Sequence, residues 1–150
     1  MGFKLSNASL KKLEGVDERL VNVVKRAIEI TDVDFSVTEG LRSVQRQREL
    51  VAKGASQTMK SKHIEGRAVD LAAFVGDRLS WELNLYDNIA EAVRMAAIEE
   101  GVSIRWGAAW QLSDITQWDG TMQDATDEYV AVRRAEGKRP FIDAPHFELS

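Results

Sequence analysis

The chain contains no cysteine, only two prolines and only two histidines among its 150 residues. The absence of cysteine excludes disulfides, thiolate metal ligands and a cysteine nucleophile, so a metal site must use His, Asp or Glu. No apolar run approaches the length needed to span a membrane, and residues 1–15 show no stretch typical of a signal peptide. We therefore expect synthesis in the cytosol, with a separate release step if the substrate lies outside.

The charge balance is slightly acidic, with a formal net charge of -4. A strong nucleic-acid binder needs a basic face that neutralises phosphates, so the net charge argues against that class. The charge also gives no support for docking on an anionic membrane. The composition, 44% hydrophobic and 29% charged, is that of an ordinary globular protein. We found no repeat, low-complexity tract or linker, so residues 1–150 are expected to form one domain.

Hydrophobic periodicity predicts a mixture of helices and strands without a regular alternation of the two, which indicates an α+β domain. Residues 1–33 are expected to form an N-terminal helical part, with Asp17 capping a helix to about Ile30, and residues 34–150 the core. Strands are expected at 34–38, 68–75, 102–106 and 146–149. Further helices are expected at 43–53, 81–100 and 127–136. The segments 54–62 and 109–126 are expected to be loops.

One candidate site lies around His63 and Asp70. Asp70 interrupts the otherwise apolar segment Ala68–Val75, and a buried carboxylate is costly unless it is paired or binds a metal. A buried Asp–Arg pair would explain Asp70 as well as a metal does. A metal ligand, however, explains His63 and Asp70 together, with Gly66 allowing the chain to turn between them.

A second candidate pair, Asp143 and His146, flanks Pro145, which restricts the backbone on both sides. Two histidines and one carboxylate, with one position left to water, form a known catalytic zinc arrangement. A further carboxylate is then needed as general acid and base. Asp143 and Glu148 both qualify, and their chemistry alone does not decide between them.

Four segments carry a family resemblance. SKHIEGRAVD resembles the Ser-x-His-x-x-Gly-x-Ala-x-Asp signature of the zinc D-alanyl-D-alanine carboxypeptidase/dipeptidase (M15-type) family, and DAPHFEL resembles its closing motif. EGLRS and WGAAW are similar to segments of one branch, the phage endolysins that are L-alanyl-D-glutamate peptidases. The resemblance implies a small antiparallel sheet packed against helices, as in Hedgehog and DD-peptidase domains.

The resemblance also implies roles for particular residues. It implies one zinc ion per chain, held by His63, Asp70 and His146, with Asp143 as the general base. The expected substrate-binding residues are Arg42, which would contact the scissile carbonyl, Gln47, Ser61 and Trp106. Many relatives have Asp where this chain has Ala109, so a loop or substrate contact must be lost or supplied elsewhere.

The expected function is therefore peptidoglycan endopeptidase activity on the L-alanyl-D-glutamate bond of the stem peptide, causing host cell lysis. We expect a monomer that binds neither nucleic acid nor membrane and leaves the host cytoplasm after holin-type release. The alternatives are a D-alanyl-D-alanine carboxypeptidase or dipeptidase, and a non-catalytic wall-binding module with a structural zinc. The acidic segment 114–128 could bind a regulatory cation, but its spacing is not that of an EF-hand loop and favours a solvated surface.

Overall fold

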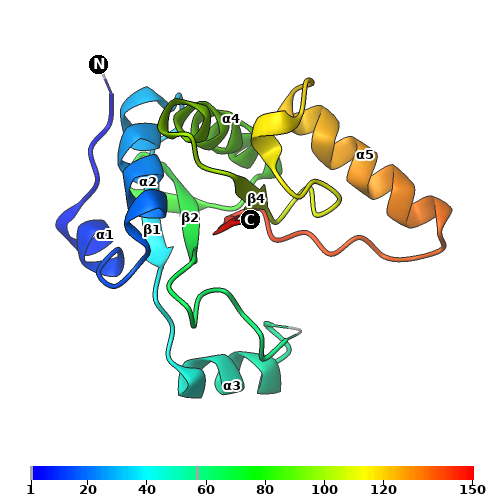
Figure 1. Ribbon diagram of the computed structural model, residues 1–150, viewed down its shortest axis with the longest axis horizontal. Helices are drawn as coiled ribbons and strands as arrows, with labels where there is room; N and C mark the ends of the chain where they lie inside the picture. The colour runs from blue at the N-terminus through cyan, green and yellow to red at the C-terminus, as the bar shows by residue number, and fades with distance from the viewer. Residues whose placement is uncertain (1, 57) are drawn as a thin grey trace.

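The computed structural model describes residues 2–56 and 58–150 as one α+β domain, shown in Figure 1. The helices are α1 (Asn7–Lys12), α2 (Glu18–Ile30), α3 (Val44–Ala52), α4 (Leu83–Glu100) and α5 (Met122–Ala135), with a 3-10 turn η1 (Ile115–Gln117). The strands are β1 (Phe35–Glu39), β2 (Ala68–Val75), β3 (Arg78–Ser80), β4 (Ile104–Trp106) and β5 (His146–Leu149).

The five strands form one sheet in which every pairing is antiparallel. The strand order is β1-β2-β5-β4, and β3 pairs with the other part of β2. The register sets Asp70 of β2 opposite His146 of β5 on one side and opposite Glu39 of β1 on the other. The expected α+β class and mainly antiparallel sheet are confirmed.

Helices α2 and α4 pack against each other and supply much of the core. The buried face of α2 repeats at helical spacing through Leu20, Val23, Val24 and Ala27, as expected from the sequence, and Asp17 caps the helix by accepting from the amide of Arg19. Figure 1 shows α3 set apart from this layer, beyond one end of β2. The residues before and after α3 therefore approach that end of the sheet from outside the core.

The segment 109–126 differs from the expected loop. It contains η1, and α5 begins at Met122, five residues before the expected start at Asp127. The cause is a capping box in which Thr121 accepts from the amide of Asp124 and the Asp124 carboxylate accepts from the amide of Thr121. The short elements α1 and β3 were not predicted separately. Within the described residues, no helix combines the length and apolar character needed to cross a bilayer.

Candidate active site

His63 lies in the loop before β2 and is almost completely buried. Its Nδ1 is 2.8 Å from the carbonyl oxygen of Gly40, and its Nε2 is 3.2 Å from Asp70 Oδ1. Because a carbonyl only accepts, Nδ1 carries a proton, and Nε2 is the ring nitrogen that faces Asp70. Gly66, with a φ of 69°, makes the turn from this loop into β2, as expected.

Asp70 and His146 are direct neighbours across the β2–β5 pair. His146 Nδ1 lies 3.3 Å from Asp70 Oδ1, and the two imidazole rings meet edge to face with centroids 5.0 Å apart. One ligand atom from each of His63, Asp70 and His146 lies within 4.8 Å of the others. In the described part of the chain this is the only His, Cys, Asp and Glu group with metal-binding spacing, and it matches a catalytic donor set of two imidazoles and one carboxylate.

The charges in this group depend on one another. Burial alone would raise the pKa of Asp70, but its hydrogen bonds with His146 and His63 hold that pKa well below the usual range. Burial alone would lower the pKa of His146, but its hydrogen bonds with Asp70 and Glu148 raise it to about 9. The three side chains thus form a buried polar cluster in which the carboxylate is ionised.

Glu148 lies on the opposite side of the His146 ring from Asp70. Its Oε1 is 2.7 Å from His146 Nε2, and its Oε2 is 3.3 Å from the ammonium group of Lys62. Hydrogen bonds to His146 and the charge of Lys62 hold the pKa of Glu148 below its usual range, although burial opposes this. Both oxygens are therefore engaged behind the ring, away from the point where the three donor atoms converge.

Asp143 belongs to the turn that precedes β5. Its amide donates to the carbonyl of Gly107 at 2.8 Å, and its carbonyl accepts from the amide of His146 at 3.0 Å. A Cβ on Gly107 would lie 2.1 Å from the Asp143 carbonyl oxygen, so only glycine fits this approach. Burial, and then the charge of Asp70, raise the pKa of Asp143. Among the described residues, no hydrogen bond or ion pair is recorded for its carboxylate.

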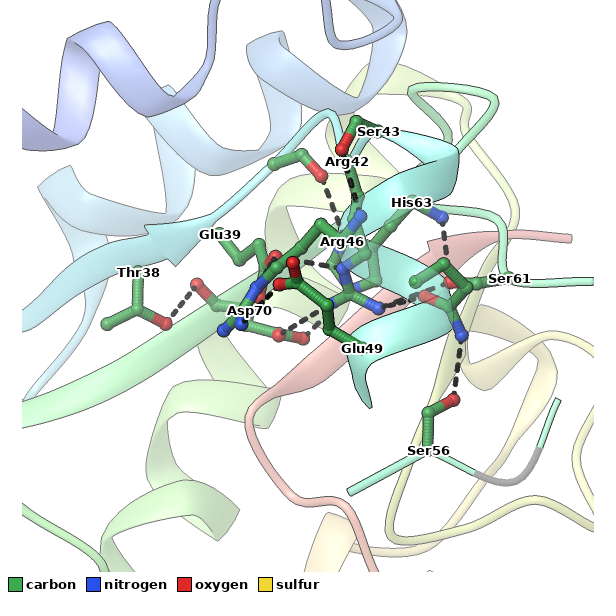
Figure 2. Close-up of polar contacts among 12 residues, drawn as sticks. Thr38, Glu39, Arg42, Ser43, Arg46, Glu49, Ser56, Ser61, His63 and Asp70 are labelled. Carbon is green, nitrogen blue, oxygen red and sulfur yellow. Dashed lines mark hydrogen bonds and ion pairs between the residues drawn. The ribbon is translucent and has the colours of Figure 1, made fainter. Parts of the chain in front are cut away.

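Arg42 is buried and held by four polar side chains, as Figure 2 shows in part. Its Nε donates to Glu39 Oε1 at 2.8 Å and its Nη1 donates to Gln47 Oε1 at 2.7 Å. Its Nη2 lies 3.7 Å from Asp70 Oδ2. The guanidinium therefore lies beside the donor cluster with its orientation fixed.

The expected substrate-binding residues divide into two groups. Arg42 and Ser61 line the cavity described below. Gln47 and Trp106 are fully buried, at 0% exposure, and do not line it. Gln47 donates to Ser56 Oγ at 2.8 Å and to the Thr58 carbonyl at 2.5 Å, and Trp106 donates to the Ala144 carbonyl at 2.7 Å. In this conformation their contacts are with the protein.

A cavity of about 580 Å³ opens over the donor cluster. His63, Asp70, Asp143 and His146 lie in its lining, and the loop after α3 forms another part of it. Trp110 and Phe141 form an aromatic wall, with ring centroids 6.4 Å apart, and the Trp110 ring lies 5.6 Å from that of His146. The cavity thus joins a polar metal-binding group to an apolar surface, as is typical of a small-molecule or peptide site.

Sequence reasoning did not assign Phe141, Glu39 or Lys62 to the site. Glu39 lies within the EGLRS segment and Lys62 directly precedes His63, so both were close to residues already selected. Phe141 lies two residues before Asp143 and had no such signal. Trp110 ends the WGAAW segment, of which only Trp106 was assigned to the site.

Comparison with known proteins agrees with this fold and site. The profile of the phage L-alanyl-D-glutamate peptidase family matches residues 1–150. The L-alanyl-D-glutamate peptidase of Escherichia phage T5 is 34% identical over 117 residues, which cover 75% of this chain and 85% of that protein. The L-alanyl-D-glutamate peptidase of Listeria phage A118 is 28% identical over 108 residues, which cover 72% of this chain and 37% of that protein.

A solved structure is also similar. The L-Ala D-Glu endopeptidase ChiX of Serratia marcescens superposes with a TM-score of 0.72 and 37% identity, over 97% of this chain and 90% of that chain. The fold and the site define a peptidase with a His–Asp–His group able to bind a metal ion. The chain belongs to the phage L-alanyl-D-glutamate peptidase family. The expected family and enzyme class are confirmed.

Proposed function

We propose that this chain is a zinc-dependent endopeptidase that hydrolyses the L-alanyl-D-glutamate bond of the peptidoglycan stem peptide and so lyses the host cell. The observation that carries the proposal is the convergence of donor atoms from His63, Asp70 and His146 on a cavity that also holds the Asp143 carboxylate. Family membership supports the choice of bond.

The donor set fits zinc. Gly40 binds Nδ1 of His63 and Glu148 binds Nε2 of His146, so the other nitrogen of each ring is left to face Asp70. Two imidazole nitrogens and a carboxylate oxygen are ligands that zinc prefers, and three protein ligands leave a position open for catalysis. When bound, zinc supplies Lewis acidity, which lowers the pKa of water to about 7 and polarises a carbonyl.

Asp143 is proposed as the general base, and the position of Glu148 supports this choice. Both carboxylates line the cavity, but Glu148 is engaged by His146 and Lys62, whereas the Asp143 carboxylate makes no hydrogen bond or ion pair with the described residues. A cavity carboxylate without a recorded protein partner is able to accept a proton from the attacking water and deliver it to the leaving amine. The different contacts of the two carboxylates therefore support Asp143 over Glu148 as the base.

Arg42 is proposed to stabilise the negative charge that develops on the scissile carbonyl. Its guanidinium lines the cavity and is fixed by Glu39 and Gln47, so little reorganisation is needed during the reaction. Ser61, whose hydroxyl lies 3.5 Å from Arg42 Nη1, is proposed as a nearby substrate contact. Gln47 and Trp106 are proposed to act by holding Arg42 and the turn before β5.

The test combines metal analysis with mass spectrometry of digested peptidoglycan. The proposal expects about one zinc per chain and new amino-terminal D-glutamate, both lost in His146→Ala. Release of D-alanine would instead indicate a carboxypeptidase. Bound zinc without cleavage of any wall preparation would indicate a wall-binding module, and either result would overturn the proposal.

Holin-type release belongs to the same proposal and has its own test. Expression in the host cytoplasm is expected to leave cells intact until a pore-forming holin is co-expressed, because the peptidoglycan lies beyond the membrane. Lysis at the same rate without the holin would contradict this route.

A further inference from the structure

A chain of three side chains leads from the metal-binding group to the loop that carries His63. Lys62 donates to the backbone carbonyl of Leu149 at 2.5 Å and pairs with Glu148 at 3.3 Å. Glu148 contacts Nε2 of His146 at 2.7 Å. The side chain of Glu148 is only 10% exposed and that of His146 only 9%, so their contact is shielded from water.

This contact decides which nitrogen of His146 keeps its proton when a metal is bound. An ionised carboxylate only accepts, so a hydrogen bond at Nε2 requires the proton there. A metal bound to His146 can then use only Nδ1, the atom that faces Asp70, once that nitrogen has lost its own proton. His63 is arranged the other way, with a proton on Nδ1 at the Gly40 carbonyl and with Nε2 facing Asp70. His63 therefore faces Asp70 Oδ1 with its Nε2, and His146 faces the same oxygen with its Nδ1.

Lys62 connects two parts of the chain that are distant in the sequence. It is adjacent to His63, whereas Glu148 lies on β5 two residues after His146. Residues at i and i+2 of a strand share a face, which places Glu148 beside the ring that it contacts. The Lys62–Glu148 pair thus joins the loop of one histidine to the strand of the other.

We infer that Glu148, held by Lys62, is a positioning residue that fixes His146 as its Nε2-protonated tautomer and thereby sets the metal affinity of the site. The inference rests on the proposed function, because it treats His146 as a metal ligand. Partners that orient a ligating histidine typically contribute 10–100-fold in metal affinity. Glu148 is placed to act through His146, because His146 and Lys62 engage its two oxygens.

The first test is the nitrogen NMR spectrum of the zinc-loaded wild-type protein, prepared without a histidine tag. Since the chain has only two histidines, both imidazoles can be assigned. The inference expects His146 to be protonated at Nε2 with zinc on Nδ1, and His63 to show the reverse. Zinc on Nε2 of His146 would overturn it, and this result does not depend on any variant folding.

The second test measures zinc affinity by competition with a chelator. Glu148→Ala should weaken zinc binding about 10–100-fold, while Glu148→Gln, whose amide oxygen still accepts from Nε2, should recover part of the loss. Lys62→Met should weaken binding less than Glu148→Ala does. Lys60→Met, two residues away on the same loop, is the matched control and should leave the affinity unchanged.

The outcomes separate the inference from the function on which it rests. A Glu148→Ala protein that binds zinc within about twofold of wild type would overturn the positioning role while leaving the zinc peptidase intact. An equal loss in Glu148→Ala and Glu148→Gln would also overturn it, because the tautomer would then not be the determinant. A wild-type protein that neither binds zinc nor cleaves peptidoglycan would instead remove the proposed function.

Discussion

The guanidinium of Arg42 donates a 2.7 Å hydrogen bond to the side chain of Gln47, a fully buried residue of α3. The amide nitrogen of the same Gln47 donates to Ser56 Oγ and to the Thr58 carbonyl, in the loop after the helix. One carboxamide therefore sets both the orientation of the cavity arginine and the path of a loop that lines the cavity. Helix α3, although it lies apart from the core, has a defined part in the site.

Gln47→Ala should lower both activity and stability. It removes the acceptor of Arg42 and the donor to Thr58, and leaving buried groups unpaired costs about 1–3 kcal/mol. We expect a lower kcat with zinc content unchanged, together with a lower free energy of unfolding by denaturant titration. Gln45→Ala is the control, because Gln45 lies on the same helix and is exposed. Equal effects of the two substitutions would contradict the role of Gln47.

Arg42→Ala should retain zinc and lower kcat. Removing one donor to a developing oxyanion typically costs about 2.7–4 kcal/mol, which is about 10²–10³ in kcat. Metal content and steady-state kinetics on purified muropeptides would measure this. Arg46→Ala is the control, because the Arg46 side chain is 46% exposed and lies on the same segment. An unimpaired kcat in Arg42→Ala would remove this residue from the mechanism.

Asp143→Asn and His146→Ala should separate the base from the ligand. Asp143→Asn is expected to keep zinc and lose about 10²–10⁴ in kcat, the usual contribution of general acid–base catalysis. His146→Ala is expected to lose zinc and activity together. Asp77→Asn, in the exposed turn between β2 and β3, should change neither. Loss of zinc in Asp143→Asn would show that this carboxylate is a ligand instead.

Gly107→Ala should damage the site through the backbone. Its Cβ would lie 2.1 Å from the Asp143 carbonyl oxygen and 3.1 Å from His146 Cβ, so the turn before β5 must move. We expect a loss of about 1–3 kcal/mol in stability, as for overpacking in general, together with weaker zinc binding. Gly120→Ala should cost less, because its nearest neighbour is the side chain of Trp118 at 2.9 Å. Thermal unfolding with and without zinc would compare the two.

Asp87→Asn should stabilise the protein at neutral pH and not in acid. Burial, and then the charges of Asp127 and Glu91, raise the pKa of Asp87 from 3.8 to about 6, and its Oδ1 is buried without a recorded hydrogen bond. The folded state therefore binds this proton more tightly than the unfolded chain does. The stabilisation from Asp87 is present below pH 3.8 and is lost as the pH rises through about 6.

At pH 7, Asp87→Asn should raise the free energy of unfolding by about 1–2 kcal/mol, after allowance for solvent screening of a half-buried group. At pH 4 the variant and the wild type should differ little. Urea unfolding at the two pH values measures the difference, with Asp77→Asn as the exposed control. A gain of the same size at both pH values would contradict the titration of Asp87.

The sequence predicted the elements whose signals are local. The apolar run of β2, the amphipathic repeat of α2 and the Asp17 cap all act within a few residues, and the structure has them at the expected places. The start of α5 was missed because the acidic composition of the segment was weighed above the Thr121 capping box. Strand β3, with the sequence Arg78-Leu79-Ser80, is mostly exposed, so it lacks the buried apolar pattern that marks a strand.

The site was predictable where chemistry restricts the choice of residue. A chain without cysteine and with two histidines offers few combinations of side chains that could bind a metal. His63, Asp70 and His146 indeed lie together. The partners of Arg42 and His146 were not predictable, since they depend on strand register and helix placement. Glu148 was a candidate base by sequence, and only its position behind the His146 ring distinguishes it from Asp143.

The pairing of Asp70 with His146 has a consequence for folding fidelity. Along β5, His146 and Glu148 alternate with Phe147 and Leu149, so a slip of one residue would turn Phe147 toward the donor cluster and bury His146 in the core. All four residues are buried, so hydrophobicity alone discriminates weakly between the two arrangements. The proposed zinc ion, which takes oxygen from Asp70 and nitrogen from His146, would fit only one of these arrangements and would thereby favour the correctly assembled sheet.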